Sequence, residues 1–236
     1  MPETMILEIH DLHAFYGESH VLHGVTMSVP EGEVVCLLGR NGAGKTTTLR
    51  SIMGIQVSRR TGSIRFLGEE LITLPPHRIA RRGIGYVPEE RGVFASLDVE
   101  ENLLLPPMVR DGGMSVEAIY RLFPNLQERR RSQGTRLSGG EQQMLAIARI
   151  LRTGARFIIL DEPTEGLAPV IVQQIGRVIL ELKRAGFTIL LVEQNFRFAS
   201  TLADRHFVME DGVVVDMISN EALERNMGRL HEYLGV

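Results

Sequence analysis

The amino-acid sequence predicts an α/β fold around a central, largely buried β-sheet. Short runs of apolar and β-branched residues, each of strand length, alternate along the chain with longer stretches of helical period. The 236 residues fit one large domain, 1–236, better than several small ones. With 44% hydrophobic and 23% charged residues, the composition is that of a folded globular chain.

Strands are expected where apolar or alternating runs lie between Gly-containing turns. The first half of the sheet is expected to contain residues 6–9, 21–29, 34–38, 63–66 and 84–87. The second half is expected to contain 157–160, 188–192, 207–209 and 213–218. The last two strands flank Glu210-Asp211-Gly212, which predicts a hairpin.

Helical periodicity predicts helices over residues 45–53, 141–152, 169–184 and 220–231. From about residue 97 to 137 the strand signal disappears. Pro106-Pro107, Asp111-Gly112-Gly113 and Pro124 separate short helical pieces there. The sequence therefore predicts a helical subdomain inserted at approximately 97–137.

Composition narrows the classes of function and the compartment. A net charge of -3, from 26 basic and 29 acidic residues, disfavours nucleic acid as a partner. Cys36 is the only cysteine, so no disulfide can form within the chain and a reducing, cytoplasmic location is expected. The first residues show no secretory signal pattern, and no apolar run approaches the ~20 residues of a membrane-spanning helix.

A phosphate-binding loop directly follows the run 34–38. Its pattern is G-x-x-x-x-G-K-[ST], placed between a predicted strand and a predicted helix, which is the context that this motif requires. Inward-facing N–H groups and the helix N-terminus favour phosphate, Lys45 offsets β- and γ-phosphate charge, and the Thr46 hydroxyl is a ligand for Mg²⁺. The residues expected to bind the nucleotide here are Gly39, Arg40, Asn41, Gly42, Ala43, Gly44, Lys45, Thr46 and Thr47.

Two adjacent carboxylates, Asp161 and Glu162, follow the apolar run 157–160. Such a pair on its own is more often a solvated turn. Open α/β sheets, however, bind ligands at the carboxyl ends of their strands. Together with the phosphate loop, the pair predicts that Asp161 supports Mg²⁺ and that Glu162 polarises an attacking water.

A third motif begins the predicted helix near residue 140. It comprises Leu137, Ser138, Gly139, Gly140 and Glu141, and its small residues at a helix N-terminus form a second potential anion site. With the phosphate loop and the Asp-Glu pair, it resembles the signature sequence of ATP-binding cassette (ABC) ATPases, and the resemblance covers nearly the whole chain. It implies an ABC-type nucleotide-binding domain with a P-loop core sheet, an N-terminal antiparallel β region and an inserted helical subdomain. It also implies that two cassettes close head to tail, so that this signature contacts the γ-phosphate held by a partner cassette.

The resemblance assigns further site residues. Tyr16 is expected to stack on adenine, although it could be an ordinary strand aromatic. Glu89 stands where most cassettes have a glutamine, and its carboxylate can bind Mg²⁺. Gln194 replaces a histidine that contacts the γ-phosphate, so it can donate a hydrogen bond but cannot become cationic. Ala168 replaces an aspartate that crosses the dimer interface.

Four segments resemble one of the two ATPase subunits of branched-chain amino-acid importers: 87–89, 163–169, 192–195 and 233–235. In that group, Glu90 stands in place of a glycine. The resemblance implies that ATP hydrolysis energises import of branched-chain or other hydrophobic amino acids. The implied partners are a second ABC ATPase subunit, two membrane permeases and, indirectly, an external solute-binding protein, with this chain peripheral on the inner face of the cell membrane.

Three alternatives stay open at this point. One is a cassette subunit of a urea or other small-amide importer. Another is a soluble ABC ATPase of DNA repair or translation, although the chain has neither a long coiled-coil insertion nor a second cassette. The third is a regulatory cassette that closes without hydrolysis, which Gln194 and Ala168 suggest.

Overall fold

The computed structural model describes residues 3–235, and its α/β architecture has two sheets. The first is antiparallel and contains β1 (Met5–Tyr16), β2 (Ser19–Pro30), β4 (Arg59–Phe66) and β5 (Glu69–Glu70), in the order β2-β1-β4-β5. The second contains β3 (Val34–Leu38), β6 (Ile84–Val87), β7 (Phe157–Asp161), β8 (Thr188–Glu193), β9 (Arg205–Glu210) and β10 (Val213–Ser219). Its order is β10-β9-β3-β8-β7-β6, and all its pairs are parallel except the β9–β10 hairpin.

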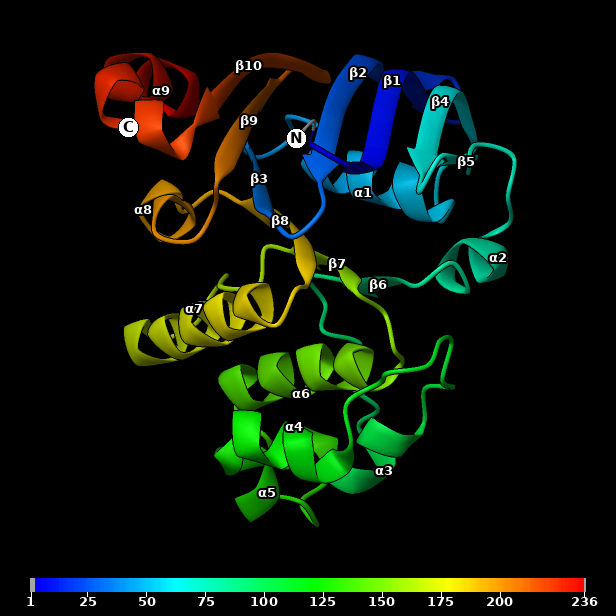
Figure 1. The fold of residues 1–236 in the computed structure, drawn as a ribbon, viewed down its shortest axis with the longest axis vertical. Coiled ribbons are helices and arrows are strands. Elements are labelled where there is room, and N and C mark those ends of the chain that lie inside the picture. Colours follow the sequence, from blue (N-terminus) through cyan, green and yellow to red (C-terminus); the bar gives the residue numbers. More distant parts are fainter. Residues whose placement is uncertain (1–2, 236) are drawn as a thin grey trace.

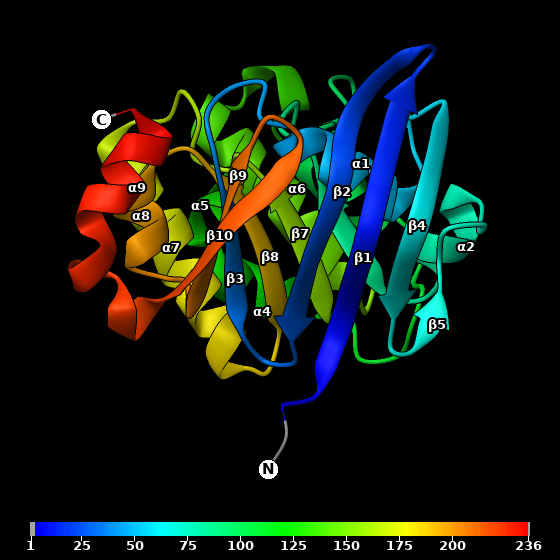
Figure 2. The ribbon, with the colours of Figure 1, turned by 90° about the horizontal axis from the view of Figure 1, so that it is seen from above.

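The expectation that the first five predicted strands form half of one sheet is wrong. Only β3 and β6 join the parallel sheet, while β1, β2 and β4 form antiparallel pairs with one another. Figure 2 shows these three strands side by side, next to the parallel sheet. The tight β1–β2 hairpin makes local antiparallel pairing available, so the early strands do not need the central sheet as a partner.

The parallel sheet separates two hydrophobic cores. In β3, Val34, Cys36 and Leu38 pack into one core, and Val35 and Leu37 pack into the other. Successive side chains of a strand point to opposite faces, so a strand that is buried on both faces must be a continuous apolar run. All five residues of β3 are buried for this reason.

The longer helices flank these cores. They are α1 (Lys45–Met53), α6 (Gly139–Arg152) and α7 (Pro169–Arg184). The sequence did not predict the shorter helices α2 (Pro76–Ala80) and α8 (Phe196–Ser200). Residues 97–137 form α3 (Val99–Leu104), α4 (Val116–Leu122), α5 (Pro124–Glu128) and the 3₁₀ turn η1 (Gly134–Arg136), which gather with α6 below the sheets in Figure 1. The boundaries of a subdomain there stay a prediction.

The expected helix over 220–231 is wrong in its first half. Residues there form the 3₁₀ turns η2 (Asn220–Ala222) and η3 (Glu224–Asn226), and α9 spans Met227–Leu234. The N–H of Leu223 donates to the Asn220 carbonyl and that of Asn226 to the Leu223 carbonyl, which is 3₁₀ bonding. The Asn226 side chain also donates to the Ala222 carbonyl, and this contact holds the tighter turn.

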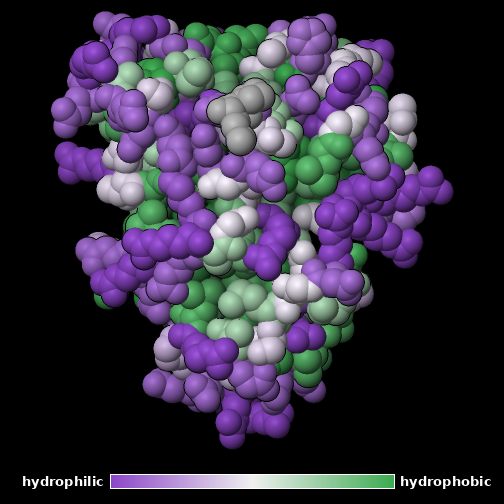
Figure 3. Space-filling model, viewed as in Figure 1, coloured by the Kyte–Doolittle hydropathy of each residue, from purple (hydrophilic) through white to green (hydrophobic). Residues whose placement is uncertain are grey.

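The surface is mixed in character. Hydrophilic residues cover most of the face drawn in Figure 3, and hydrophobic residues show between them. Among residues 3–235, no helix has both the length and the apolar character needed to cross a membrane.

Candidate functional site

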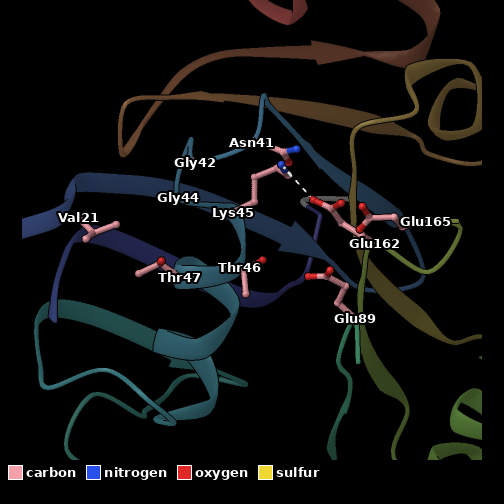
Figure 4. Close-up of a pocket in the computed structure, with 10 residues that line it drawn as sticks. All are labelled: Val21, Asn41, Gly42, Gly44, Lys45, Thr46, Thr47, Glu89, Glu162 and Glu165. Atoms are coloured by element: carbon pink, nitrogen blue, oxygen red, sulfur yellow. Dashed lines mark ion pairs between the residues drawn. The ribbon is translucent and has the colours of Figure 1, made fainter. Parts of the chain in front are cut away.

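The phosphate loop joins β3 to α1 and lines a cavity of about 380 Å³. Gly42 and Gly44 have φ angles of 82° and 106°, a backbone region that favours glycine. A Cβ on Gly39 would lie 2.5 Å from the Met209 carbonyl oxygen, so the loop needs glycine there to pack against β9. The lining residues, drawn in Figure 4, are Val21, Asn41, Gly42, Gly44, Lys45, Thr46, Thr47, Glu89, Glu162 and Glu165.

Lys45 is held in place by the loop that it follows. Its Nζ donates to the carbonyls of Gly39 at 2.9 Å and Arg40 at 3.1 Å, and only 4% of its side chain is exposed. The same Nζ lies 3.2 Å from Glu162 Oε1. The ammonium group is therefore positioned inside the cavity, at the start of α1.

Glu162 is held between a cation and an amide. The Gln194 side chain donates to Glu162 Oε2 at 2.6 Å, opposite the contact with Lys45. Glu162 has a φ of 44°, in the left-handed region, and its N–H donates to the Val192 carbonyl. A non-glycine residue in this conformation costs about 1–3 kcal/mol, so the surrounding contacts must enforce it. The three residues expected to be catalytic, Lys45, Glu162 and Gln194, thus meet in one place.

Asp161 accepts hydrogen bonds on both carboxylate oxygens. Thr46 donates to Oδ1 at 3.2 Å and the Tyr86 hydroxyl donates to Oδ2 at 3.1 Å. Burial raises the pKa of Asp161 to about 6, although both hydrogen bonds oppose the shift. A buried carboxylate of this kind gains from a nearby cation.

The oxygen donors of Thr46, Asp161 and Glu89 suit Mg²⁺. Thr46 and Asp161 are in direct contact, and Glu89 lines the same cavity as Thr46. Across residues 3–235, no group of three or more His, Cys, Asp or Glu side chains is arranged to hold a metal ion. This arrangement fits Mg²⁺, which usually takes one or two protein oxygens and completes its shell with water and substrate phosphates.

Two further carboxylates lie near Glu162. Glu165 lines the cavity. Its pKa is raised mainly by partial burial and, to a smaller extent, by the neighbouring Glu162 and Glu89 carboxylates. Glu193 is buried, accepts a 2.8 Å hydrogen bond from Thr164, and has its pKa raised to about 7, mainly by burial. The region is rich in negative charge and would attract a cation or a metal-bound nucleotide.

Three side chains at the site were not expected from the sequence. Val21 and Glu165 line the cavity, and Tyr86 orients Asp161. Tyr86 on β6 pairs with Ile159 on β7, and Ile159 lies two residues before Asp161 in the chain. Only that register reveals the contact, and no sequence motif signals it.

Several of the residues expected to bind nucleotide lie outside the cavity lining: Tyr16, Gly39, Arg40, Ala43 and the signature residues. Tyr16 ends β1, is half-buried, and has a buried hydroxyl without a hydrogen-bond partner among the described residues. The Arg40 side chain turns instead toward α9, where it donates to two backbone carbonyls.

The signature residues Leu137–Glu141 also do not line the cavity. They form the N-terminus of α6. The Ser138 hydroxyl accepts from the Glu141 N–H at 3.3 Å, and the Glu141 carboxylate accepts from the Ser138 N–H at 2.7 Å. This capping box fixes the first turn and leaves Ser138 exposed.

Known proteins are similar to this chain in sequence and fold. The profile of the family described as ABC transporter matches residues 22–165. The chain is 43% identical over 233 residues to the high-affinity branched-chain amino acid transport ATP-binding protein BraG of Pseudomonas aeruginosa, covering 98% of this chain and 100% of BraG. It is 37% identical over 215 residues to the lipopolysaccharide export system ATP-binding protein LptB of Escherichia coli, covering 89% of this chain and 88% of LptB.

The chain belongs to the ABC transporter family of ATP-binding proteins. A solved structure of an ATP binding subunit of an ABC transporter matches it with a TM-score of 0.80 and 30% identity, covering 98% of this chain and all of that one. The predicted family, fold class and ATPase activity are thereby confirmed. This ABC ATPase binds ATP.

Proposed function

We propose that this ABC ATPase energises import of branched-chain or other hydrophobic amino acids through a membrane transporter. The observation that supports this solute class is the similarity to BraG, which extends over the whole of BraG and is greater than the similarity to LptB. The sequence segments 163–169 and 233–235 support the same group. This chain would supply the ATP-driven motion and would not contact the solute.

The cavity suggests how ATP is held. Backbone N–H groups of the loop and the N-terminus of α1 would face the phosphates, and Lys45 would offset their charge. Thr46, Asp161 and Glu89 would hold Mg²⁺, which would neutralise charge on the β- and γ-phosphates. Because Lys45 is paired with Glu162, incoming phosphates compete for the ammonium and leave Glu162 free to act as a base.

Glu162 is the proposed general base. It accepts a proton from water as the water oxygen bonds to the γ-phosphorus, and the bond from that phosphorus to the β–γ bridging oxygen breaks. ADP and inorganic phosphate result. Gln194 holds the base through its 2.6 Å hydrogen bond, and its second amide N–H would donate to a γ-phosphate oxygen. Tyr16 is proposed as the adenine contact.

The complete site would need a second cassette. Since Leu137–Glu141 do not line this chain's own cavity, they are free to contact ATP on a partner ATPase subunit. We propose two permeases as further partners, with a solute-binding protein acting through them. The chain would then lie on the inner face of the cell membrane.

One specific observation favours a second candidate. The similarity to LptB, whose name describes lipopolysaccharide export, leaves an exporter of a lipidic solute as the alternative. The urea or small-amide importer, the soluble ABC ATPase and the non-hydrolysing cassette have no comparable observation in their favour.

The test is an inventory of proteins that co-purify from native membranes with tagged Glu162→Gln protein. Samples trapped with ATP are compared with samples without nucleotide by mass spectrometry. Recovery of two polytopic permeases of the amino-acid importer type and a second cassette supports the proposal. Recovery of export-type membrane proteins, of urea-type permeases, or of ribosomes and DNA would contradict it and select the corresponding alternative.

A further inference from the structure

Arg40 belongs to the phosphate loop, yet its side chain serves the far end of the chain. Its Nε donates to the Tyr233 carbonyl at 3.0 Å and its Nη2 donates to the Glu232 carbonyl at 3.1 Å. Nearly two hundred residues separate the partners in sequence, and both acceptors lie in the last turn of α9. The loop and the C-terminal helix are therefore in direct contact.

The contact has the form of a helix cap. The last four carbonyls of an α-helix lack partners within the helix, and a cation is favoured at this negative end of the helix dipole. An arginine can satisfy two such carbonyls at once, because its guanidinium presents several N–H groups in a fixed plane. Gly235 completes the arrangement: its φ is 71°, and a Cβ there would lie 2.5 Å from Arg40 Nη2.

Helix α9 is anchored to the rest of the molecule. Leu230 is fully buried in the core that also contains residues of α7 and the parallel sheet, and Tyr233 and Leu234 pack against the same core. Arg229 forms a 2.6 Å ion pair with Asp216 on β10. The helix is thus a fixed support, to which Arg40 attaches.

On the loop side, the backbone of Arg40 holds the residues that meet ATP. Its carbonyl accepts from Lys45 Nζ at 3.1 Å and from the Ala43 N–H at 3.2 Å. A displacement of Arg40 therefore moves an acceptor of Lys45 and one end of the loop's turn.

We propose that Arg40 is a positioning residue through which helix α9 holds the phosphate loop in its ATP-binding conformation. Arg40 acts through its backbone on Lys45, while its guanidinium takes its position from α9. The C-terminal helix is consequently part of the apparatus that sets ATP affinity, although it does not contact the nucleotide. The proposal rests on binding of ATP at the phosphate loop, which the wild-type measurement below checks separately.

Two variants break the contact from opposite sides. Arg40→Ala removes the donor, and Gly235→Ala leaves the loop unchanged but places a methyl group against the guanidinium. Gly228→Ala is the matched control, since it makes the same change within α9 where a Cβ would meet nothing within 4 Å. The measurements use the full chain: KM and kcat for ATP, the dissociation constant for ATP, the thermal unfolding midpoint, and hydrogen exchange of α9 amides with and without ATP.

Both Arg40→Ala and Gly235→Ala are expected to raise KM and the dissociation constant about tenfold and to leave kcat at saturating ATP unchanged, because the lost interaction acts on binding. Gly228→Ala should behave as wild type. By reciprocity of coupling, ATP should protect α9 amides in the wild type and fail to do so in Arg40→Ala.

Other outcomes overturn the proposal. If Arg40→Ala weakens binding while Gly235→Ala does not, the arginine acts without α9. If Gly228→Ala weakens ATP binding as much as Gly235→Ala, the effect comes from any change in the helix and not from the contact with Arg40. If Arg40→Ala and Gly235→Ala keep the unfolding midpoint and the ATP affinity of the wild type, the contact is incidental. Failure of the wild type to bind ATP would instead refute the ATP site.

Discussion

The position of Glu162 between Lys45 and Gln194 concentrates the proposed chemistry on one carboxylate. Glu165 lies in the same cavity, but no hydrogen bond joins it to Gln194. Glu162→Gln keeps the size of the side chain and removes its basicity. We expect kcat to fall by at least about 100-fold, the usual contribution of general base catalysis, with ATP still bound.

Single-turnover ATP hydrolysis and equilibrium ATP binding measure the two effects. Glu165→Gln is the matched control, because it makes the same change within the same cavity. An equal loss of turnover in Glu165→Gln would show that total negative charge, and not the Glu162 base, is responsible.

We expect Glu193 to make the stability of the fold depend on pH. Burial raises its pKa from an ordinary 4.5 to about 7 in the folded chain, so its stabilising effect is complete below about pH 4.5 and is lost as pH rises through 7. Glu193→Gln removes this titration and can still accept from Thr164. Relative to the variant, the wild type should lose up to about 3 kcal/mol of unfolding free energy between pH 4.5 and 8.

Denaturant unfolding of both proteins at several pH values measures this difference. A constant difference between wild type and Glu193→Gln across the range would mean that Glu193 does not change protonation in the folded state.

At the scale of helices and strands, the sequence pattern predicts an element correctly where a single local feature determines its structure. Residues 34–38, 84–87 and 45–53 fold as expected, since a buried apolar run or a motif-initiated helix specifies each. β1 extends well beyond 6–9, because polar His10, Asp11 and His13 hide a strand whose pairing with β2 and β4 sustains it. Membership of the antiparallel sheet likewise depends on tertiary pairing.

The site likewise contains features that local sequence determines and features that tertiary structure determines. The phosphate loop, Asp161 and Glu162 could be placed from their motifs, because strand ends deliver them to one edge of the sheet. The Tyr86 bond to Asp161 and the contact from Arg40 to α9 depend on strand register and on the path of the C-terminus. These are properties of the folded chain, and no local pattern encodes them.

Gly85 on β6 allows the strand to pack closely against α6. A Cβ on Gly85 would collide with Ile150 Cγ2 and would lie 3.3 Å from Ala155 Cβ. Gly85→Ala should therefore lower the free energy of unfolding by about 1–3 kcal/mol, the usual cost of overpacking. Ile150→Ala, which removes the opposing atoms, should recover part of the loss when combined with Gly85→Ala.

A double-mutant cycle by chemical denaturation measures the coupling between the two positions. Strictly additive effects would show that the backbone moves enough to separate β6 from α6 and that the two side chains do not meet.

At the scale of the whole molecule, the signature and the phosphate loop lie on different parts of one chain. Ser138 is exposed at the start of α6, and the cavity lining includes no residue from Leu137–Glu141. Under the proposed mechanism, a site that uses both motifs would need two chains, with ATP between them. Hydrolysis would then open the pair, so a chain that binds ATP without hydrolysing it should remain closed.

We therefore expect Glu162→Gln protein to form an ATP-dependent dimer in size-exclusion chromatography with light scattering. Adding Ser138→Arg should abolish the dimer and leave ATP binding to the separate chain intact, because the change lies outside the cavity. Ser115→Arg is the matched control: Ser115 also caps a helix, accepting from the Ala118 N–H at 3.2 Å, but that helix is α4. If Ser115→Arg prevents the dimer equally, loss of a helix cap explains the result. If Ser138→Arg leaves the dimer intact, the signature does not face a second chain of this kind.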